Sequence, residues 1–153
     1  MKTLITTFIA IACAVSAQAK PFYTNYVVPN GYRGPLVMII HPEKGLELPP
    51  LPSTWDFIFN SHGKITVKRS TYKPPHSSQG QMENHAGPRA RYEDGTVIPM
   101  EGTVADDEIA FRSVYGVGPN TETGETSVGA IYFFVGTLEE AKRFELNQKK
   151  KQS

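Results

Sequence analysis

The residues best suited to chemistry lie between residues 73 and 91, in a segment without helical or strand periodicity. This segment contains His76, Glu83, His85, Arg89 and Arg91. Imidazole and carboxylate groups are ligands of zinc, and a guanidinium can hold a carboxylate or phosphate through two parallel hydrogen bonds. Long unpatterned connections in compact domains are functional or disordered, and a solvated loop is the commoner case. This segment is therefore the first candidate for a binding site.

A divalent metal site is one alternative within this segment. Its ligands would be His76, Glu83 and His85, with Glu101, His41 or His62 as further candidates. The spacing does not reproduce the H-E-x-x-H pattern, which places two histidines on one helical face. A metal-free protein without a cofactor is therefore the main expectation.

A second candidate for ligand binding is the turn formed by Pro29-Asn30-Gly31-Tyr32-Arg33-Gly34. Proline presets the first turn position, and Asn and Gly tolerate the positive φ of a tight reversal. The glycines are explained by backbone geometry alone. Tyr32 and Arg33 are the two side chains of this turn that could bind a ligand.

The expected domain lacks the residues that several classes of enzyme require. The only cysteine, Cys13, precedes the expected domain, which excludes thiol catalysis and cysteine-ligated zinc. Gly116-Val117-Gly118 is followed by turn residues and not by a helix, which argues against a dinucleotide loop. An enzyme is therefore the less expected reading, although the residues leave the question open.

Two apolar runs predict the centre of the fold. Leu36 to Ile40 is apolar without alternation and is bounded by Pro35 and Pro42, which favours a strand buried on both faces. Ile131 to Val135 has the same character. We expect these two strands, far apart in sequence, to form the core together.

The remaining elements are shorter. Trp55–Phe59 and 64–72 are expected to form a hairpin around Asn60-Ser61-His62-Gly63, and Glu93-Asp94-Gly95 predicts a turn before a short strand. Thr137-Leu138-Glu139-Glu140 is a capping box that begins a helix ending near Asn147. The predicted fold class is mainly β: a single β-sandwich or barrel-like domain of about seven strands with one short C-terminal helix.

The first 19 residues have the three regions of a secretory signal peptide. Lys2 is followed by an apolar stretch, and Ala17 and Ala19 form an A-x-A cleavage site before Lys20. The apolar stretch is shorter than the roughly 20 residues of a membrane-spanning helix. We expect a signal peptide at 1–19, one β-rich domain at 20–147 and a basic tail at 148–153. Lipid attachment at Cys13 is the less favoured alternative.

The charge balance limits the partners. Because Lys2 is the only charged residue of the leader, the remaining chain has 15 basic and 15 acidic residues. A balanced domain lacks the electrostatic footprint of a nucleic-acid-binding protein. We therefore expect no nucleic acid and no transmembrane segment in the mature chain. The partner would be a protein or a small molecule, and the oligomeric state stays open.

The chain resembles an uncharacterised family of small bacterial exported domains and lipoproteins. The resemblance rests on the P-x-G-Y-x-G segment at residues 29–34 and on the closing Phe133-Phe134-Val135-Gly136-Thr137-Leu138-Glu139-Glu140. It implies export and a single domain. Because the family has no assigned activity, the resemblance implies no catalytic residue.

Three hypotheses for function follow. The first is a periplasmic or otherwise secreted non-catalytic binding domain, because no catalytic or cofactor motif is present. The second is a metal carrier or metal-dependent secreted enzyme that uses the loop histidines. The third is an envelope-associated structural protein held by the basic tail or by acylated Cys13.

Overall fold

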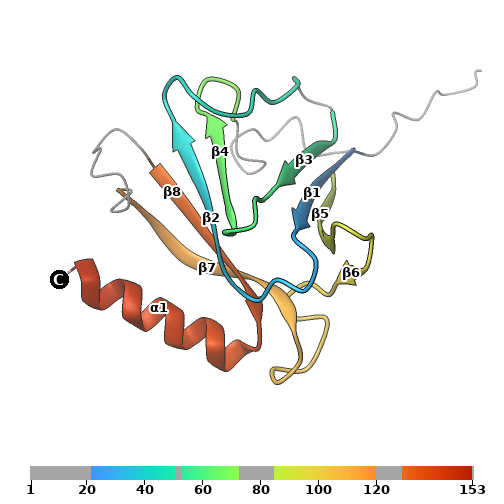
Figure 1. Ribbon diagram of the computed structural model, residues 1–153, viewed down its shortest axis with the longest axis vertical. Helices are drawn as coiled ribbons and strands as arrows, with labels where there is room; N and C mark the ends of the chain where they lie inside the picture. Colours follow the sequence, from blue (N-terminus) through green and yellow to red (C-terminus); the bar gives the residue numbers. More distant parts are fainter. Residues whose placement is uncertain (1–21, 51–52, 73–84, 120–128, 153) are drawn as a thin grey trace, which may run out of the picture.

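The computed structural model of the chain describes residues 22–50, 53–72, 85–119 and 129–152. Within these ranges the chain forms eight strands and one C-terminal helix (Figure 1). The elements are β1 (Phe22–Val28), β2 (Gly34–His41), β3 (Trp55–Ile58), β4 (Lys64–Lys68), β5 (His85–Tyr92), β6 (Val97–Ile98), β7 (Ala110–Pro119), β8 (Gly129–Gly136) and α1 (Leu138–Gln152).

The strands form two four-stranded sheets, with the orders β3-β1-β5-β6 and β4-β2-β8-β7. Both sheets are mixed. In the first, β1 is parallel to β3 and β5, while β5 is antiparallel to β6. In the second, β2 is parallel to β4 but antiparallel to β8. The predicted mainly β class with one C-terminal helix is confirmed. An isolated bridge between Met100, just after β6, and Phe111 of β7 connects the two sheets, but over the described residues they do not close into one barrel.

Aromatic side chains join the two sheets into one core. The ring of Tyr26 on β1 lies 4.7 Å from that of Phe111 on β7 and 4.9 Å from that of Phe133 on β8, between ring centroids. Phe57 on β3 stacks on the same tyrosine at 5.6 Å. Burial raises the pKa of Tyr26 well above its ordinary value, because the phenolate would lose its hydration there.

The two apolar runs predicted to form the core are neighbouring strands. β2 and β8 pair antiparallel over seven residue pairs from Gly34↔Val135 to Ile40↔Gly129. Leu36 and Met38 face the core between the sheets, and Val37 faces the opposite side, where α1 lies. The prediction of a strand buried on both faces is confirmed for β2.

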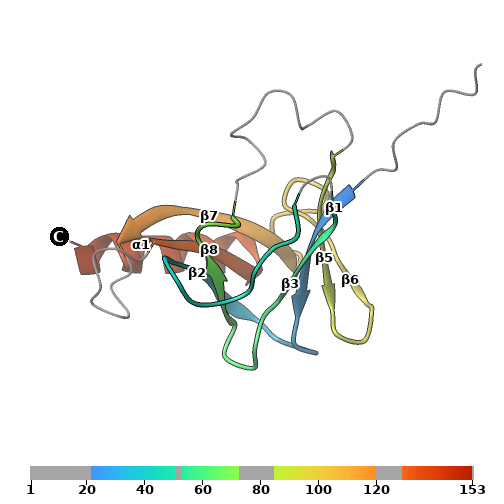
Figure 2. The same ribbon diagram turned by 90° about the horizontal axis from the view of Figure 1, so that it is seen from above.

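The helix adds a third layer on the sheet that contains β2 and β8. Ala141 and Phe144 of α1 pack against this sheet, where the rings of Phe134 and Phe144 are 5.8 Å apart. Figure 1 shows α1 on one side of the sheet of β2 and β8 and the sheet of β1 and β5 on the other side. In Figure 2 the two sheets are seen beside each other, with α1 behind β7 and β8. The outer face of the sheet of β1 and β5 is therefore not covered by the helix.

The expected hairpin at residues 55–72 is wrong. A turn is present, because Gly63 N–H donates to Asn60 O at 2.9 Å. However, β3 pairs with β1 and β4 pairs with β2, so the chain crosses from one sheet to the other at this turn. Turn residues predict a reversal, but long-range pairing decides which sheet receives the next strand.

The expectation of an unpatterned connection up to residue 91 is also wrong in its last part, which forms β5. Phe22 pairs with His85 and Thr24 pairs with Pro88, so β5 has one extra residue here. Gly87, with φ of 91°, lies in this irregularity and provides its positive φ. The bulge lets a strand containing Pro88 join the sheet, where pairing with β1 outweighs its weak intrinsic preference.

The helix begins as predicted and extends further. Thr137 N–H donates to Glu140 Oε2 at 2.9 Å, and Glu140 N–H donates to Thr137 Oγ1 at 3.3 Å, which confirms the capping box. The helix continues to Gln152 instead of ending near Asn147. Lys149 pairs with Glu145 one turn earlier at 2.8 Å, and this pair supports the added turn.

No helix in the described ranges is long and apolar enough to cross a membrane. Residues 1–21, which include the predicted signal peptide and Cys13, lie outside the described residues. The predicted domain bounds therefore stay predictions.

Candidate functional site

The outer face of the sheet β3-β1-β5-β6 gathers polar, cationic and apolar side chains. We call it the open face and define it by Tyr23, Asp56, Ile58, Arg89, Arg91 and Val97. Successive strand residues point to opposite sides, so these residues alternate with the core residues of the same strands. Phe57 and Ile98, for example, are 1% exposed, whereas the adjacent Ile58 and Val97 are 60% and 75% exposed. Exposed large apolar side chains beside arginines are typical of interaction surfaces.

Arg89 and Arg91 lie on this face because β5 is a strand. They are two residues apart on β5, and Ala90 between them is buried in the core. In the register of the sheet, Arg89 lies beside Asn25, and Arg91 lies between Val27 and Val97. Two of the residues predicted to bind ligands are thus brought together on one surface.

Tyr23 positions the guanidinium of Arg89. The central guanidinium carbon lies 3.5 Å from the centroid of the Tyr23 ring, a cation–π contact between β1 and β5. A guanidinium that stacks by its flat face keeps its N–H groups at the edge, where they can donate to an acceptor. Within the described ranges, neither Arg89 nor Arg91 forms an ion pair with a carboxylate.

One carboxylate also belongs to the open face. Asp56 on β3 accepts a hydrogen bond from Asn25 Nδ2 at 2.7 Å, and Asn25 lies between Asp56 and Arg89 in the register. The β3 side of the face is therefore anionic and the β5 side cationic.

Tyr32 and Arg33 lie away from the open face, at the turn before β2, and both are held by other parts of the chain. Tyr32 Oη donates to Pro35 O at 2.6 Å, and partial burial raises the pKa of Tyr32, while nearby Lys64 opposes that rise. Arg33 Nη2 donates to both carboxylate oxygens of Glu140 on α1, at 2.8 and 3.0 Å. These contacts show a structural role, and ligand binding by either residue stays a prediction.

The predicted metal ligands lie only partly within the described residues. His76 and Glu83 lie outside the described residues, and His85 is the first residue of β5, where it pairs with Phe22. His41 Nδ1 accepts hydrogen bonds from the backbone N–H groups of Glu43 and Lys44. In the part of the chain that the structure describes, no three His, Cys, Asp or Glu residues are grouped to hold a metal.

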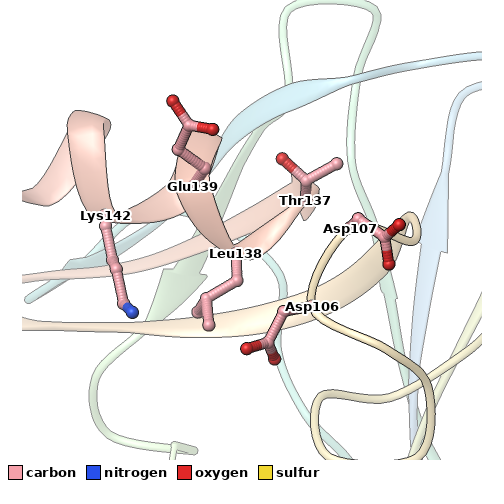
Figure 3. Close-up of a pocket in the computed structure, with 6 residues that line it drawn as sticks. All are labelled: Asp106, Asp107, Thr137, Leu138, Glu139 and Lys142. Atoms are coloured by element: carbon pink, nitrogen blue, oxygen red, sulfur yellow. The ribbon is translucent and has the colours of Figure 1, made fainter.

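A surface pocket of about 400 Å³ lies where α1 begins, a feature that the sequence did not predict. Its lining comes from the loop before β7 and from the first turns of α1: Asp106, Asp107, Thr137, Leu138, Glu139 and Lys142. Figure 3 shows Leu138 and Lys142 extending toward the side where Asp106 lies, while Glu139 points the other way. Only the capping box and the adjacent acidic residues 106–108 mark this region in the sequence.

The pocket is explained by the start of the helix. Leu138 N–H donates to Asp106 O at 2.8 Å, and Glu140 N–H donates to the Thr137 hydroxyl. The chain itself thus occupies helix donors that would otherwise attract an anion. Acidic residues at a helix N-terminus also stabilise the positive end of the helix dipole. We therefore take the open face, and not this pocket, as the candidate functional site.

The comparisons with known proteins do not assign the chain to a family. No protein-family model and no curated protein matches the chain. Among solved structures, the chain is similar to one described as "Putative Lipoprotein from Bacillus anthracis", with 13% sequence identity and a TM-score of 0.45. The match covers 80% of this chain and 75% of that chain. The resemblance to small exported domains therefore stays a prediction.

Proposed function

We propose that the protein is an exported, non-catalytic binding domain and that the open face is its binding surface. Export follows from the signal peptide predicted at residues 1–19. The observation that carries the binding role is the pair Arg89 and Arg91. Both are exposed on the sheet face that α1 does not cover, and neither has a carboxylate partner among the described residues.

The shape of the surface supports binding rather than catalysis. Enzymes bring reacting groups together in concave sites that exclude water. The open face is the outer side of a sheet, and Ile58, Arg89, Arg91 and Val97 on it are exposed to solvent. Such a surface can recognise an extended partner, but it cannot enclose a small substrate.

Nuclear magnetic resonance of the protein purified after export tests the proposal. The probes are synthetic acidic, basic and neutral peptides, inorganic polyphosphate, and vesicles that contain phosphatidylglycerol. We expect an anionic probe to shift the amide signals of β1 and β5. The double variant R89Q/R91Q should lose this response, whereas R143Q, which removes an exposed arginine of α1, should keep it. The proposal is wrong if no probe shifts these signals, or if the double variant responds as the wild type does.

Zinc addition separates the proposal from the metal alternative. The binding-domain proposal expects no change in melting temperature when zinc is added to protein purified without a histidine tag. A stabilisation that disappears in a variant lacking His76 and His85 would instead favour the metal site.

A further inference from the structure

We infer that the open face binds an extended acidic segment of a partner protein, with carboxylates at alternate positions. This inference rests on the proposed function and names the class of ligand. It depends on the spacing of the two arginines, on their N–H donors, which no carboxylate of the described residues occupies, and on the apolar and anionic side chains around them.

The spacing matches an extended peptide. Arg89 and Arg91 are two residues apart on β5 and point to the same side of the sheet. Same-side residues of a strand repeat about every 6.6 to 6.8 Å, and this repeat is a property of any extended chain. Carboxylates at positions i and i+2 of an extended peptide therefore have the same separation as the two arginines.

The donors suit carboxylates. Tyr23 contacts the flat face of the Arg89 guanidinium and so leaves its N–H edge available. A guanidinium edge and a carboxylate form two parallel charge-assisted hydrogen bonds. Two such pairs at a fixed spacing would distinguish alternate acidic residues from adjacent ones, because adjacent side chains of an extended peptide point to opposite sides.

The apolar side chains favour a polypeptide over a simple polyanion. Ile58, Val27, Arg91 and Val97 form one row across the sheet, with Ile58 and Val97 exposed at its ends. Val97 lies directly beside Arg91 in the register, so a ligand that covers Arg91 along β5 also covers this exposed valine and gains if it carries an apolar side chain. Polyphosphate and lipid headgroups offer charge but no such side chains.

Asp56 restricts how the ligand lies. It is on β3, on the opposite side of Asn25 from Arg89, and it would repel an acidic residue placed there. The acidic residues of the partner should therefore lie over β5, and neutral or basic residues over β3. This charge pattern is complementary to a peptide of mixed composition and disfavours a uniformly anionic surface.

Three peptides of matched length test the inference by fluorescence anisotropy. One contains Glu-Val-Glu, the second contains Glu-Glu-Val, and the third contains Gln-Val-Gln. We expect the first to bind at least about tenfold more tightly than the second, as loss of one bidentate pair would produce. The third should not bind measurably. Affinity should fall as salt is raised, since the arginines are exposed.

Variants of the protein assign the effect to the open face. R89Q/R91Q should abolish binding of the Glu-Val-Glu peptide, and R143Q should leave it unchanged. R89K/R91K keeps both charges but lacks the planar fork, so it should bind the two acidic peptides about equally. The circular dichroism spectrum of each variant checks that it is folded.

The outcomes separate the inference from the proposed function. Equal binding of the two acidic peptides to the wild type would overturn the inference. Binding of polyphosphate or phosphatidylglycerol vesicles through Arg89 and Arg91, without peptide binding, would also overturn it and leave the open face as a binding surface. If none of these probes binds at the open face, the inference and the proposed function are both wrong.

Discussion

Arg33 and Glu140, which are 107 positions apart in the sequence, form an ion pair in which Arg33 Nη2 donates to both carboxylate oxygens, at 2.8 and 3.0 Å. The turn before β2 is thereby joined to the first turn of α1. The same carboxylate accepts the Thr137 N–H of the capping box. The turn at residues 29–34 and the capping box, on which the resemblance to exported domains rests, therefore meet at the Glu140 carboxylate. This contact gives Arg33 and Glu140 a structural role.

The ion pair predicts a specific dependence of stability on pH. The Thr137 N–H and then the Arg33 guanidinium hold the pKa of Glu140 below its ordinary value of 4.5. The unfolded chain thus binds this proton at higher pH than the folded chain, and the stabilisation is lost as pH falls through the lowered pKa.

We expect E140Q to be less stable than the wild type near neutral pH and equally stable in strong acid. Urea unfolding from about pH 7 down to about pH 2 measures this difference. The double variant R33Q/E140Q is the control, because it should be no less stable than E140Q. A gap between wild type and E140Q that stays constant below pH 4.5 would contradict the assignment.

Two glycines with the same backbone conformation should respond differently to alanine. Gly31 and Gly63 have φ of 69° and 68°. A Cβ atom at Gly31 would meet open space, whereas at Gly63 it would collide with the Tyr32 hydroxyl and lie 2.8 Å from Pro35 O. G31A should cost about 1 to 2 kcal/mol from the left-handed conformation alone. G63A should cost about 1 to 3 kcal/mol more, because the Tyr32 contact must move. Equal denaturation midpoints would show that Tyr32 is not fixed against Gly63.

The central strands could be predicted because their composition is decisive on its own. Leu36 to Ile40 and Ile131 to Val135 are apolar on both faces, and only the centre of a sheet covered on both sides accommodates such strands. The capping box is likewise local, since Thr137 and Glu140 satisfy each other's amides. Sheet membership of β3 and β4 was not predictable, because it depends on pairing with β1 and β2, which are distant in sequence.

Only part of the open face could be predicted from the sequence. The chemistry of Arg89 and Arg91 predicts ligand binding, but the sequence does not predict their strand, because Gly87 and Pro88 disfavour a strand. The alternation of Arg89, Ala90, Arg91 and Tyr92 was the available signal, and it is weak because alanine contributes little apolar area. Tyr23, Ile58 and Val97 come from other strands, so only the sheet register brings them to the same surface.

Arg112 should be the most sensitive charged residue. It is 2% exposed, and its guanidinium donates to the backbone carbonyls of Gly136 at 3.0 Å, Glu108 at 3.1 Å and Asp106 at 3.4 Å. It thus holds the loop before β7 against the end of β8. R112M leaves three carbonyls without this donor and should cost about 1 to 3 kcal/mol, as an unsatisfied buried polar group typically does.

The matched control for R112M is R143M, at an exposed position of α1, which should change the free energy of unfolding by about 0.5 kcal/mol or less. R112K keeps a charge, but its donors are all on one nitrogen and cannot replace both Nε and Nη2, which reach these carbonyls. Its stability should therefore lie between those of the wild type and R112M. Chemical denaturation of all three variants measures the order. Similar stabilities for R112M and R143M would show that the buried guanidinium is not needed.

The leader predicts a defined mature N-terminus. The predicted cleavage after Ala19 would give a protein that begins at Lys20, because Ala17 and Ala19 provide the small residues that signal peptidase requires. We expect intact-mass measurement of protein exported by a bacterial host to show this start, with release from cells in the absence of detergent. C13S should be exported in the same amount, since Cys13 is removed with the leader.

A mass that corresponds to a lipid-modified N-terminal Cys13, together with loss of membrane attachment in C13S, would instead show a lipoprotein. The open face would then be presented near a membrane surface, where an acidic partner segment would have to compete with anionic headgroups for Arg89 and Arg91.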